Sequence, residues 1–478
     1  MSIETKPGEL RDLNARKVFM IGIGGCSMSG LALLLKSYGY DVSGSTSIDT
    51  EYIPALTKQG IRVYAEDNPE DMAGSDLVIY SHAITAENPM VKAARKNGIP
   101  LKSRSWLLGK LSGEFERSIS VCGTHGKTTV TSMISQILID TDQDPTVHIG
   151  GIYPPIGGNV RSGKSSLFLT EACEYQRSFL SLHPTGIVLL NIDRDHLDCY
   201  RDIDEIEETF GSFLKQLPED GWVLGCGEDS RVLKLLKSSN CRTFAYGLSD
   251  TCDYYMEKPS EDSEGYYQFD FCHNGEKLGH VHMGIPGLFN ALNAMSALGA
   301  AHILGIDPAA ACETISRFRG AHRRFELTGT INGAELIMDY GHNPTEMRNA
   351  VSIARKRCKG GRLWAVMQPN NYIRVKTLFQ DYLTCTEEAD ITLVTDIYGY
   401  KYQDTGDISS GMLVEGMRRH HVNAVLTPGL SDAVAMIESG VRPGDLVIMM
   451  GCGNIHLLND LLVKKDEEPV QGKELSGK

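Results

Sequence analysis

A short glycine-rich loop at residues 123–129 has the residue types and the spacing to bind phosphate groups. The loop, Gly-Thr-His-Gly-Lys-Thr-Thr, follows an apolar run at residues 119–122 and precedes a stretch with helical periodicity. In a strand–turn–helix unit of this kind, backbone N–H groups and the helix dipole face a bound anion. Lys127 adds a mobile positive charge, and the Thr128 hydroxyl can hold Mg²⁺. The sequence therefore predicts a nucleoside triphosphate site at this loop.

The loop is shorter than the standard Walker A motif. That motif needs four residues between its first glycine and the Gly-Lys pair. Counting back from Gly126 leads to Val121 instead of a glycine. The short loop therefore argues against most GTPases and motor ATPases and favours a narrower family.

The composition indicates a folded protein with several domains. The 478 residues exceed what one hydrophobic core supports, and 61 acidic residues against 47 basic ones give a net charge of −14. This charge argues against nonspecific binding to nucleic acid. The twelve cysteines include no CxxC pair, so we expect neither a zinc site nor a disulfide scaffold. A polar N-terminus and the shortness of the apolar runs favour a cytoplasmic protein without membrane insertion.

Apolar runs alternate with helical patterns along most of the chain, which predicts parallel sheets covered by helices on both faces. We expect strands at residues 18–21, 40–42, 61–64, 77–80, 167–169, 187–190, 222–224, 243–246, 335–338, 363–367, 391–395, 424–427 and 446–450. One segment departs from this alternation, because Asn274-Gly275 separates apolar runs at 266–271 and 278–283. That dipeptide between such runs predicts a β-hairpin.

The pattern predicts three tandem α/β domains. The first is a Rossmann-like N-terminal domain at residues 1–116, and the second is a P-loop-type central ATPase domain with a mainly parallel sheet at 117–324. A Rossmann-like C-terminal domain follows at 325–464. Residues 465–478 are rich in Lys, Glu and Gly, and we expect them to form a disordered tail.

A second glycine-rich turn follows the first predicted strand. Gly22, Gly24 and Gly25 would let the backbone approach a pyrophosphate at a helix N-terminus. Ser27 stands where the third glycine of the NAD-binding fingerprint would fall, and no acidic residue follows the second strand where that fingerprint has one. An ordinary tight turn is one interpretation. The density of glycines favours a diphosphate ligand other than NAD.

The phosphate loop and this three-domain plan resemble the Mur ligase family. Further motifs that carry the resemblance are Gly22-Ile23-Gly24-Gly25 with Met28-Ser29-Gly30, Glu171-Ala172-Cys173-Glu174, Asn191-Ile192-Asp193-Arg194-Asp195-His196-Leu197-Asp198, Asn290-Ala291-Leu292-Asn293, Arg323-Arg324-Phe325, and Asp339-Tyr340-Gly341-His342-Asn343-Pro344-Thr345-Glu346. Each motif is weak alone, but their order and spacing make the resemblance specific.

The resemblance implies an ATP- and Mg²⁺-dependent ligase of peptidoglycan precursor synthesis. The carboxylate of UDP-N-acetylmuramate would attack the γ-phosphate of ATP, and L-alanine would then displace phosphate from the acyl phosphate. The first domain would bind the UDP-sugar, the second ATP and the third the amino acid. The partners are therefore small molecules, with no nucleic acid, and the protein is expected to be a monomer or a homodimer.

The resemblance also assigns roles to individual residues. The expected catalytic residues are Lys127, Glu171, His196, Arg324 and His342. The expected ATP contacts are Gly123, Thr124, His125, Gly126, Lys127, Thr128, Thr129, Asn290, Asn293, Arg324, Asp339 and Tyr340. The expected sugar-nucleotide and amino-acid contacts are Gly22, Gly24, Gly25, Ser29, His125, Asn191, His342 and Arg374. The expected Mg²⁺ ligands are Thr128, Glu171 and His196, with Glu174 as a competitor of Glu171.

The predicted amino-acid site departs from the family's pattern. Asn370 and Asn371 stand where the family usually has a His and often a basic residue, and Met338 and Asn343 replace a common Asp and His. Glycine or L-serine therefore stays open beside L-alanine. Two other functions also stay open: a ligase that recycles muropeptides onto the same sugar nucleotide, and a regulator that binds nucleotide without catalysis.

Overall fold

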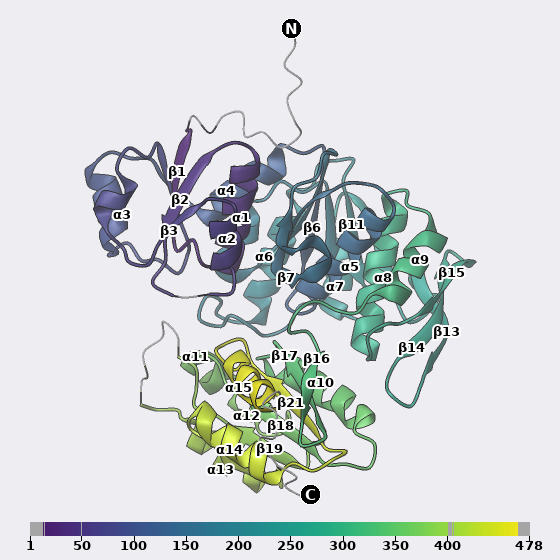
Figure 1. The fold of residues 1–478 in the computed structure, drawn as a ribbon. Coiled ribbons are helices and arrows are strands. Elements are labelled where there is room, and N and C mark those ends of the chain that lie inside the picture. The colour runs from purple at the N-terminus through teal and green to yellow at the C-terminus, as the bar shows by residue number, and fades with distance from the viewer. Residues whose placement is uncertain (1–12, 14, 49, 400–403, 405, 467–478) are drawn as a thin grey trace, which may run out of the picture. The chain divides into compact units, whose positions relative to one another are not determined.

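Three β-sheets organise the described part of the chain in the computed structural model, which comprises residues 13, 15–48, 50–399, 404 and 406–466 (Figure 1). The first two sheets belong to one unit, residues 1–194, 199–260 and 267–322. The third sheet belongs to a second unit, which also contains residues 195–198 and 261–266. The predicted α/β architecture with mainly parallel sheets is confirmed.

The N-terminal sheet is fully parallel and has the order β3-β2-β1-β4-β5. Its strands are β1 (Lys17–Ile21), β2 (Asp41–Ser45), β3 (Arg62–Tyr64), β4 (Leu77–Tyr80) and β5 (Leu101–Ser103). Its helices are α1 (Cys26–Ser37), α2 (Ile53–Lys58), α3 (Pro89–Lys96) and α4 (Arg104–Gly113), with the short η1 (Pro69–Met72). The strand order reverses at β1, and a ligand crevice forms at such a switch point beyond the carboxyl ends of the strands.

The central sheet has ten strands in the order β15-β14-β13-β12-β11-β10-β6-β9-β7-β8. Their bounds are β6 (Arg117–Cys122), β7 (Thr146–Tyr153), β8 (Gly158–Arg161), β9 (Leu167–Glu171), β10 (Gly186–Leu189), β11 (Trp222–Cys226), β12 (Arg242–Gly247), β13 (Tyr254–Glu261), β14 (Tyr267–His273) and β15 (Glu276–His282). The helices are α5 (Lys127–Asp140), α6 (Ile203–Leu214), α7 (Ser230–Lys237), α8 (Leu288–Ile303) and α9 (Pro308–Arg317), with the short η2 (Pro154–Ile156) and η3 (Tyr175–Ser181). The apolar faces of α5 and α8 share one core with the central strands, which fixes the start of α5 at the sheet.

The C-terminal sheet has the order β16-β17-β21-β18-β19-β20. Its strands are β16 (Glu326–Ile331), β17 (Ala334–Asp339), β18 (Leu363–Met367), β19 (Ile391–Val394), β20 (Ala424–Leu426) and β21 (Leu446–Met450). Its helices are α10 (Pro344–Arg357), α11 (Tyr372–Thr377), α12 (Phe379–Tyr382), α13 (Ser410–Arg419), α14 (Leu430–Gly440) and α15 (His456–Asp466). Two buried clusters lie on the sheet's two faces, as a doubly covered parallel sheet requires.

The predicted strands are all present, within a few residues of their expected ends. The predicted hairpin joins β14 and β15, and its turn residues Asn274 and Gly275 have φ of 48° and 85°. Five strands were not predicted from the sequence: β5, β7, β8, β13 and β16. Of the predicted tail, residues 465 and 466 end α15, and residues 467–478 lie outside the described part. No described helix is both long enough and apolar enough to span a bilayer.

Within the larger unit, the N-terminal and central domains pack tightly through α4. A Cβ at Gly109 of α4 would lie 2.0 Å from the Ser181 carbonyl oxygen, so only glycine permits this approach. One turn further along α4, the Ser112 hydroxyl accepts a hydrogen bond from the His183 N–H at 2.9 Å. The helix is therefore held at a defined position against residues 178–183.

A buried histidine connects the same two domains. His148 of β7 is 2 % exposed, and its Nε2 lies 3.0 Å from the Ser27 hydroxyl of α1. Its Nδ1 lies 3.2 Å from the Thr170 hydroxyl of β9. Burial, and then the charge of Arg104, lower the pKa of His148 to about 4. The imidazole is therefore neutral near pH 7.

This histidine should make the unit acid-sensitive. Its folded pKa of about 4 lies below the ordinary value of about 6.5, so the unfolded chain binds the proton more tightly. The resulting stability is complete above about pH 6.5 and is lost as the pH falls toward 4, by about 3 kcal/mol. We expect the free energy of unfolding of a His148→Asn variant, measured with urea, to fall less steeply than that of the parent between pH 7 and 4.5. His183→Gln, at an exposed histidine of the same unit, is the matched control. Parallel profiles for parent and His148→Asn would contradict this assignment.

Candidate nucleotide and substrate site

The phosphate loop connects β6 to α5 through two glycines with left-handed backbone. Gly123 and Gly126 have φ of 137° and 87°, values that favour glycine. A Cβ at Gly126 would lie 2.7 Å from the Asn293 side-chain oxygen, and one at Gly123 would lie 2.9 Å from Leu190. Both conformation and space therefore require glycine here. The loop ends at the N-terminus of α5, where Gly126 offers no side-chain cap.

Lys127 crosses its own loop and forms an ion pair with Glu174. Its Nζ lies 2.5 Å from the Gly123 carbonyl, 2.9 Å from the Thr124 carbonyl and 3.0 Å from the nearer Glu174 oxygen. The Glu174 side chain is 3 % exposed. Burial acts to lower the pKa of Lys127, but the charge of Glu174 outweighs it, and the net pKa is raised. The ammonium therefore stays charged and points back over the loop.

A second set of hydrogen bonds holds the loop against the segment after β10. The His125 N–H donates to the Asn191 side-chain oxygen at 2.8 Å, and the Asn191 amide donates to the His125 carbonyl at 3.1 Å. The His125 ring lies 2.9 Å from an Asp193 oxygen, and the Thr124 hydroxyl accepts the Asp193 N–H at 2.9 Å. In this structure His125 and Asn191 thus brace the loop. Their contact with the sugar nucleotide stays a prediction.

Thr128 and Glu171 lie against neighbouring glycines of β7. A Cβ at Gly150 would lie 2.4 Å from the Glu171 carboxylate, and one at Gly151 would lie 3.3 Å from the Thr128 methyl group. The Gly150 N–H donates to Glu171 at 2.7 Å. The two predicted Mg²⁺ ligands therefore share one short stretch of strand. Among the described residues, no group of three or more His, Cys, Asp or Glu side chains forms a metal site.

Asn290 and Asn293 are buried in the first turns of α8, next to the phosphate loop. The Asn293 amide donates to the Asn290 oxygen at 3.3 Å, and the Asn290 amide donates to the Pro286 carbonyl at 2.7 Å. The proximity of Asn293 to Gly126 brings this pair to the predicted nucleotide site. Their contact with adenine stays a prediction.

The N-terminal glycine turn has the form expected of a diphosphate cradle. The Gly22 N–H donates to the Ser45 carbonyl at 2.8 Å, and Gly22 has φ of 79°. Gly25 is the N-cap of α1 and has no side chain, so the first N–H groups of the helix receive no side-chain hydrogen bond from their N-cap. The Ser29 hydroxyl is buried and donates to the Cys26 carbonyl at 2.7 Å, so it stabilises the helix start itself.

In the second unit, Arg323, Arg324 and Tyr340 form a cluster at the start of the C-terminal domain. The guanidinium carbons of Arg323 and Arg324 lie 5.0 Å and 4.9 Å from the Tyr340 ring centre. Arg323 is buried and donates to the Gly451 carbonyl at 3.1 Å, which gives it a structural role. Asp339 accepts the N–H groups of Gly341 and Phe325 at 2.7 Å and 2.9 Å. Arg324 therefore remains the arginine predicted to contact phosphate.

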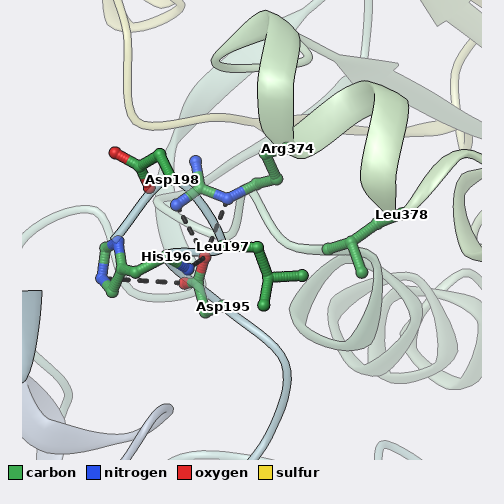
Figure 2. Close-up of a pocket in the computed structure, with 6 residues that line it drawn as sticks. All are labelled: Asp195, His196, Leu197, Asp198, Arg374 and Leu378. Atoms are coloured by element: carbon green, nitrogen blue, oxygen red, sulfur yellow. Dashed lines mark hydrogen bonds and ion pairs between the residues drawn. The ribbon is translucent and has the colours of Figure 1, made fainter. Parts of the chain in front are cut away.

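A buried ion pair joins Arg374 to Asp195 (Figure 2). The Arg374 Nε and Nη2 atoms donate to the same Asp195 oxygen at 2.9 Å and 2.8 Å, and each side chain is 8 % exposed. Burial opposes the ionisation of Asp195, but His196 and Arg374 outweigh it and hold the pKa well below its usual range. These residues line a small pocket together with Leu197, Asp198 and Leu378. Arg374 was predicted to bind the substrate carboxylate, and that role would require it to share its charge with Asp195.

His342 lies in the same unit and pairs with Cys452. Burial acts to lower the pKa of His342 and to raise that of Cys452, but their mutual interaction reverses both directions. The Tyr382 hydroxyl donates to the His342 carbonyl at 2.7 Å. Cys452 and Tyr382 were not predicted, because each lies far along the chain from His342 and belongs to no motif around it.

Two of the unusual residues in the predicted amino-acid site act as helix caps. The Asn343 oxygen accepts the Thr345 N–H at 3.0 Å at the start of α10, and the Asn371 oxygen accepts the Ile373 N–H at 2.9 Å at the start of α11. Asn371 has φ of 67°, which asparagine tolerates better than most residues. Met338 is buried in β17. Helix capping and sheet packing therefore account for three of the four departures.

Comparison with known proteins assigns each domain. The Mur ligase family catalytic domain matches residues 17–116, the Mur ligase middle domain matches residues 121–301, and the Mur ligase glutamate ligase domain matches residues 323–453. UDP-N-acetylmuramate–L-alanine ligase of Acetivibrio thermocellus is 37 % identical over 94 % of this chain and 96 % of its own length. The enzyme of the same name from Clostridium tetani is 39 % identical over 94 % and 98 %.

Solved structures give the same result. The UDP-N-acetylmuramate-alanine ligase of Thermotoga maritima superposes with a TM-score of 0.81 at 25 % identity and covers 94 % of this chain and 99 % of its own. A murein peptide ligase from Psychrobacter arcticus shares the fold with a TM-score of 0.73 at 24 % identity, over 96 % and 100 % of the two chains. The phosphate loop, the three sheets and these similarities together show that the chain belongs to the Mur ligase family.

Proposed function

We propose that this ligase joins L-alanine to the carboxylate of UDP-N-acetylmuramate at the expense of ATP. The observation that carries the proposal is the charged Lys127, held over a phosphate loop by Glu174, in a chain of this family. Relatives that match nearly the whole chain bear the name of this activity. Asn343 and Asn371 cap helices, so these two departures from the family's pattern do not argue against L-alanine as the amine.

The reaction is proposed in two steps. A carboxylate oxygen of the sugar nucleotide attacks the γ-phosphorus of ATP, and ADP leaves with the electrons of the broken P–O bond. The amine then attacks the acyl carbon, loses its proton, and displaces inorganic phosphate. Negative charge concentrates on the transferred phosphoryl group in the first step. A cation and directed N–H groups in a site with little water stabilise that charge, and Lys127 and the start of α5 provide them.

Mg²⁺ is proposed to bind at Thr128 and Glu171. Mg²⁺ usually takes one or two protein carboxylates and completes its shell with phosphate oxygens and water, so it does not need a large cluster of side chains. Glu171 and Thr128 meet this requirement beside the glycines of β7. Glu174 fits less well, because it pairs with Lys127. The ion would neutralise phosphate charge when bound. Whether His196 binds a second ion stays a prediction.

The other expectations remain proposals with indirect support. The protein is proposed to be cytoplasmic. Its twelve cysteines are free, as is usual in the cytoplasm, and the proposed substrates, a nucleotide sugar and ATP, are typical of that compartment. The sugar nucleotide is proposed to bind the glycine turn after β1, and Arg324, Asp339 and Tyr340 are proposed to contact ATP. The chain is proposed to be a monomer or a homodimer.

An assay of phosphate release tests the reaction and its amine. We expect release that requires ATP, Mg²⁺, UDP-N-acetylmuramate and L-alanine together, with slower release for glycine and L-serine. Release only with a tripeptide as the amine would identify a muropeptide-recycling ligase. Binding of ATP without release for any amine would indicate a regulator and contradict the proposal.

The role of Lys127 is tested by substitution. Lys127→Ala removes the cation at the phosphate loop, so we expect kcat to fall by at least ~10²-fold. The Kd for UDP-N-acetylmuramate, measured by calorimetry, should change little. Lys215→Ala is a matched control, because Lys215 is an exposed lysine that ends α6 in the same domain. Full turnover by Lys127→Ala would contradict the assignment of the loop.

A further inference from the structure

Cys452 follows β21 at the carboxyl edge of the C-terminal sheet, between the ends of two other strands. Strand β21 pairs in parallel with both β17 and β18, so that Met450 lies opposite Asp339 and Met367. The segments that follow the three strands therefore leave the sheet side by side. This topology brings Cys452 next to His342, although the two residues are far apart in the sequence.

The turn that carries Cys452 is held closely against the end of β18. A Cβ at Gly453 would overlap the side-chain oxygen of Gln368, and the Gly451 N–H donates to the Asp339 carbonyl at 3.1 Å. Gln368 is 4 % exposed, and its side-chain oxygen has no hydrogen-bond partner among the described residues. An acceptor without a donor thus lies beside this turn, and a hydroxyl group added there would supply one.

Cys452 shares a hydrogen bond with His342. Burial acts to raise the pKa of the Cys452 thiol, but His342 outweighs it, and the net pKa is lowered. The His342 Nδ1 lies 3.2 Å from the Tyr340 carbonyl and 3.6 Å from a Glu346 oxygen, and these contacts orient the ring. A thiol, an imidazole beside it and a carboxylate that orients the imidazole are the parts of an activated nucleophile.

Three charged side chains surround this pair. Arg374 acts to lower the pKa of both Cys452 and His342, and Glu346 acts to raise both. Asp195 pairs with Arg374 and offsets its charge. The effects of the surrounding charges therefore oppose each other, and the direct contact between Cys452 and His342 decides which of the two holds the proton.

Cys452 is partly exposed and has a lowered pKa, a combination that most of the other cysteines lack. Seven of the twelve cysteines are buried. Cys26 and Cys173 are partly exposed, but burial raises the pKa of both thiols, to about 11 for Cys26. Cys241 is partly exposed and contacts a hydroxyl group and a backbone carbonyl, so it serves as a reference thiol.

We propose that Cys452 is an oxidation site through which a peroxide inhibits the ligase, with His342 as the group that accepts the proton of the thiol. The thiolate sulfur attacks one oxygen of the peroxide, an S–O bond forms as the O–O bond breaks, and Cys452 becomes a sulfenic acid. The leaving hydroxide takes the proton from His342 and departs as water. The sulfur is oxidised and the peroxide is reduced, so no further reactant is needed. The inhibition rests on the proposed function, because His342 is predicted to contact the incoming amino acid.

Alkylation of the full chain by iodoacetamide at a series of pH values tests the state of the thiol. Mass spectrometry of peptides follows each cysteine separately. Because the thiolate is the nucleophile, the pH of half-maximal rate reports the ionisation of a thiol independently of its access. We expect this pH to be lower for Cys452 than for Cys241. In His342→Asn it should rise, and alkylation of Cys452 at pH 6.5 should slow ~10-fold.

Two outcomes of the alkylation experiment would overturn the proposal. One is a half-maximal pH for Cys452 at or above that of Cys241. The other is a folded His342→Asn variant in which the profile of Cys452 is unchanged. The profile of the parent decides the first point even if His342→Asn folds poorly.

Hydrogen peroxide tests the consequence for turnover, measured as phosphate release with ATP, Mg²⁺, UDP-N-acetylmuramate and L-alanine. In the parent, release should fall in proportion to the Cys452 sulfenic acid that dimedone traps in parallel samples, and dithiothreitol should restore it. Cys452→Ala should keep its own initial rate after peroxide, whereas the control Cys241→Ala should lose activity as the parent does. Equal loss in Cys452→Ala would contradict the proposal. If the untreated parent released no phosphate, the proposed function would fail, and the alkylation profile would still test the thiol.

Discussion

Compensation of the Lys127 charge is the constraint around which the central domain is arranged. The ammonium lies over the loop, where two backbone carbonyls and Glu174 surround it. This position requires left-handed glycines at 123 and 126, a strand that ends at Glu171 so that Glu174 follows closely, and an α5 start held firmly by its buried face. A nucleotide phosphate carries the same sign of charge as Glu174. In the proposed function, a triphosphate at this loop would therefore replace one counterion of Lys127 with another.

The sheltered arginines of this chain also differ in the groups that surround their charge. Arg374 donates to Asp195 and to Asn370, and Arg323 donates to the Gly451 carbonyl, so both stabilise the C-terminal unit. Arg104 has only hydroxyl partners.

Local features of the sequence predicted much of the fold and the strand–turn–helix form of the phosphate loop. Buried parallel strands are continuous apolar runs, and Asn274-Gly275 specifies its turn by conformation alone. Strand β7 escaped prediction because Gly150 and Gly151 interrupt its apolar pattern, and those glycines admit Glu171 and Thr128. The sequence also did not predict which residues far apart in the chain pair with each other. Nothing in the order of residues indicates that Arg374 meets Asp195, that Glu174 rather than Glu171 pairs with Lys127, or that Asn371 caps a helix. Each outcome depends on the folded backbone.

The central claim is that the site activates a carboxylate by transferring the γ-phosphoryl group of ATP to it. The most direct measurement uses UDP-N-acetylmuramate labelled with ¹⁸O in its carboxylate, with ATP, Mg²⁺ and L-alanine, and follows the label by mass spectrometry. The account predicts that one carboxylate oxygen appears in the released inorganic phosphate. Unlabelled phosphate, or label in AMP, would contradict it.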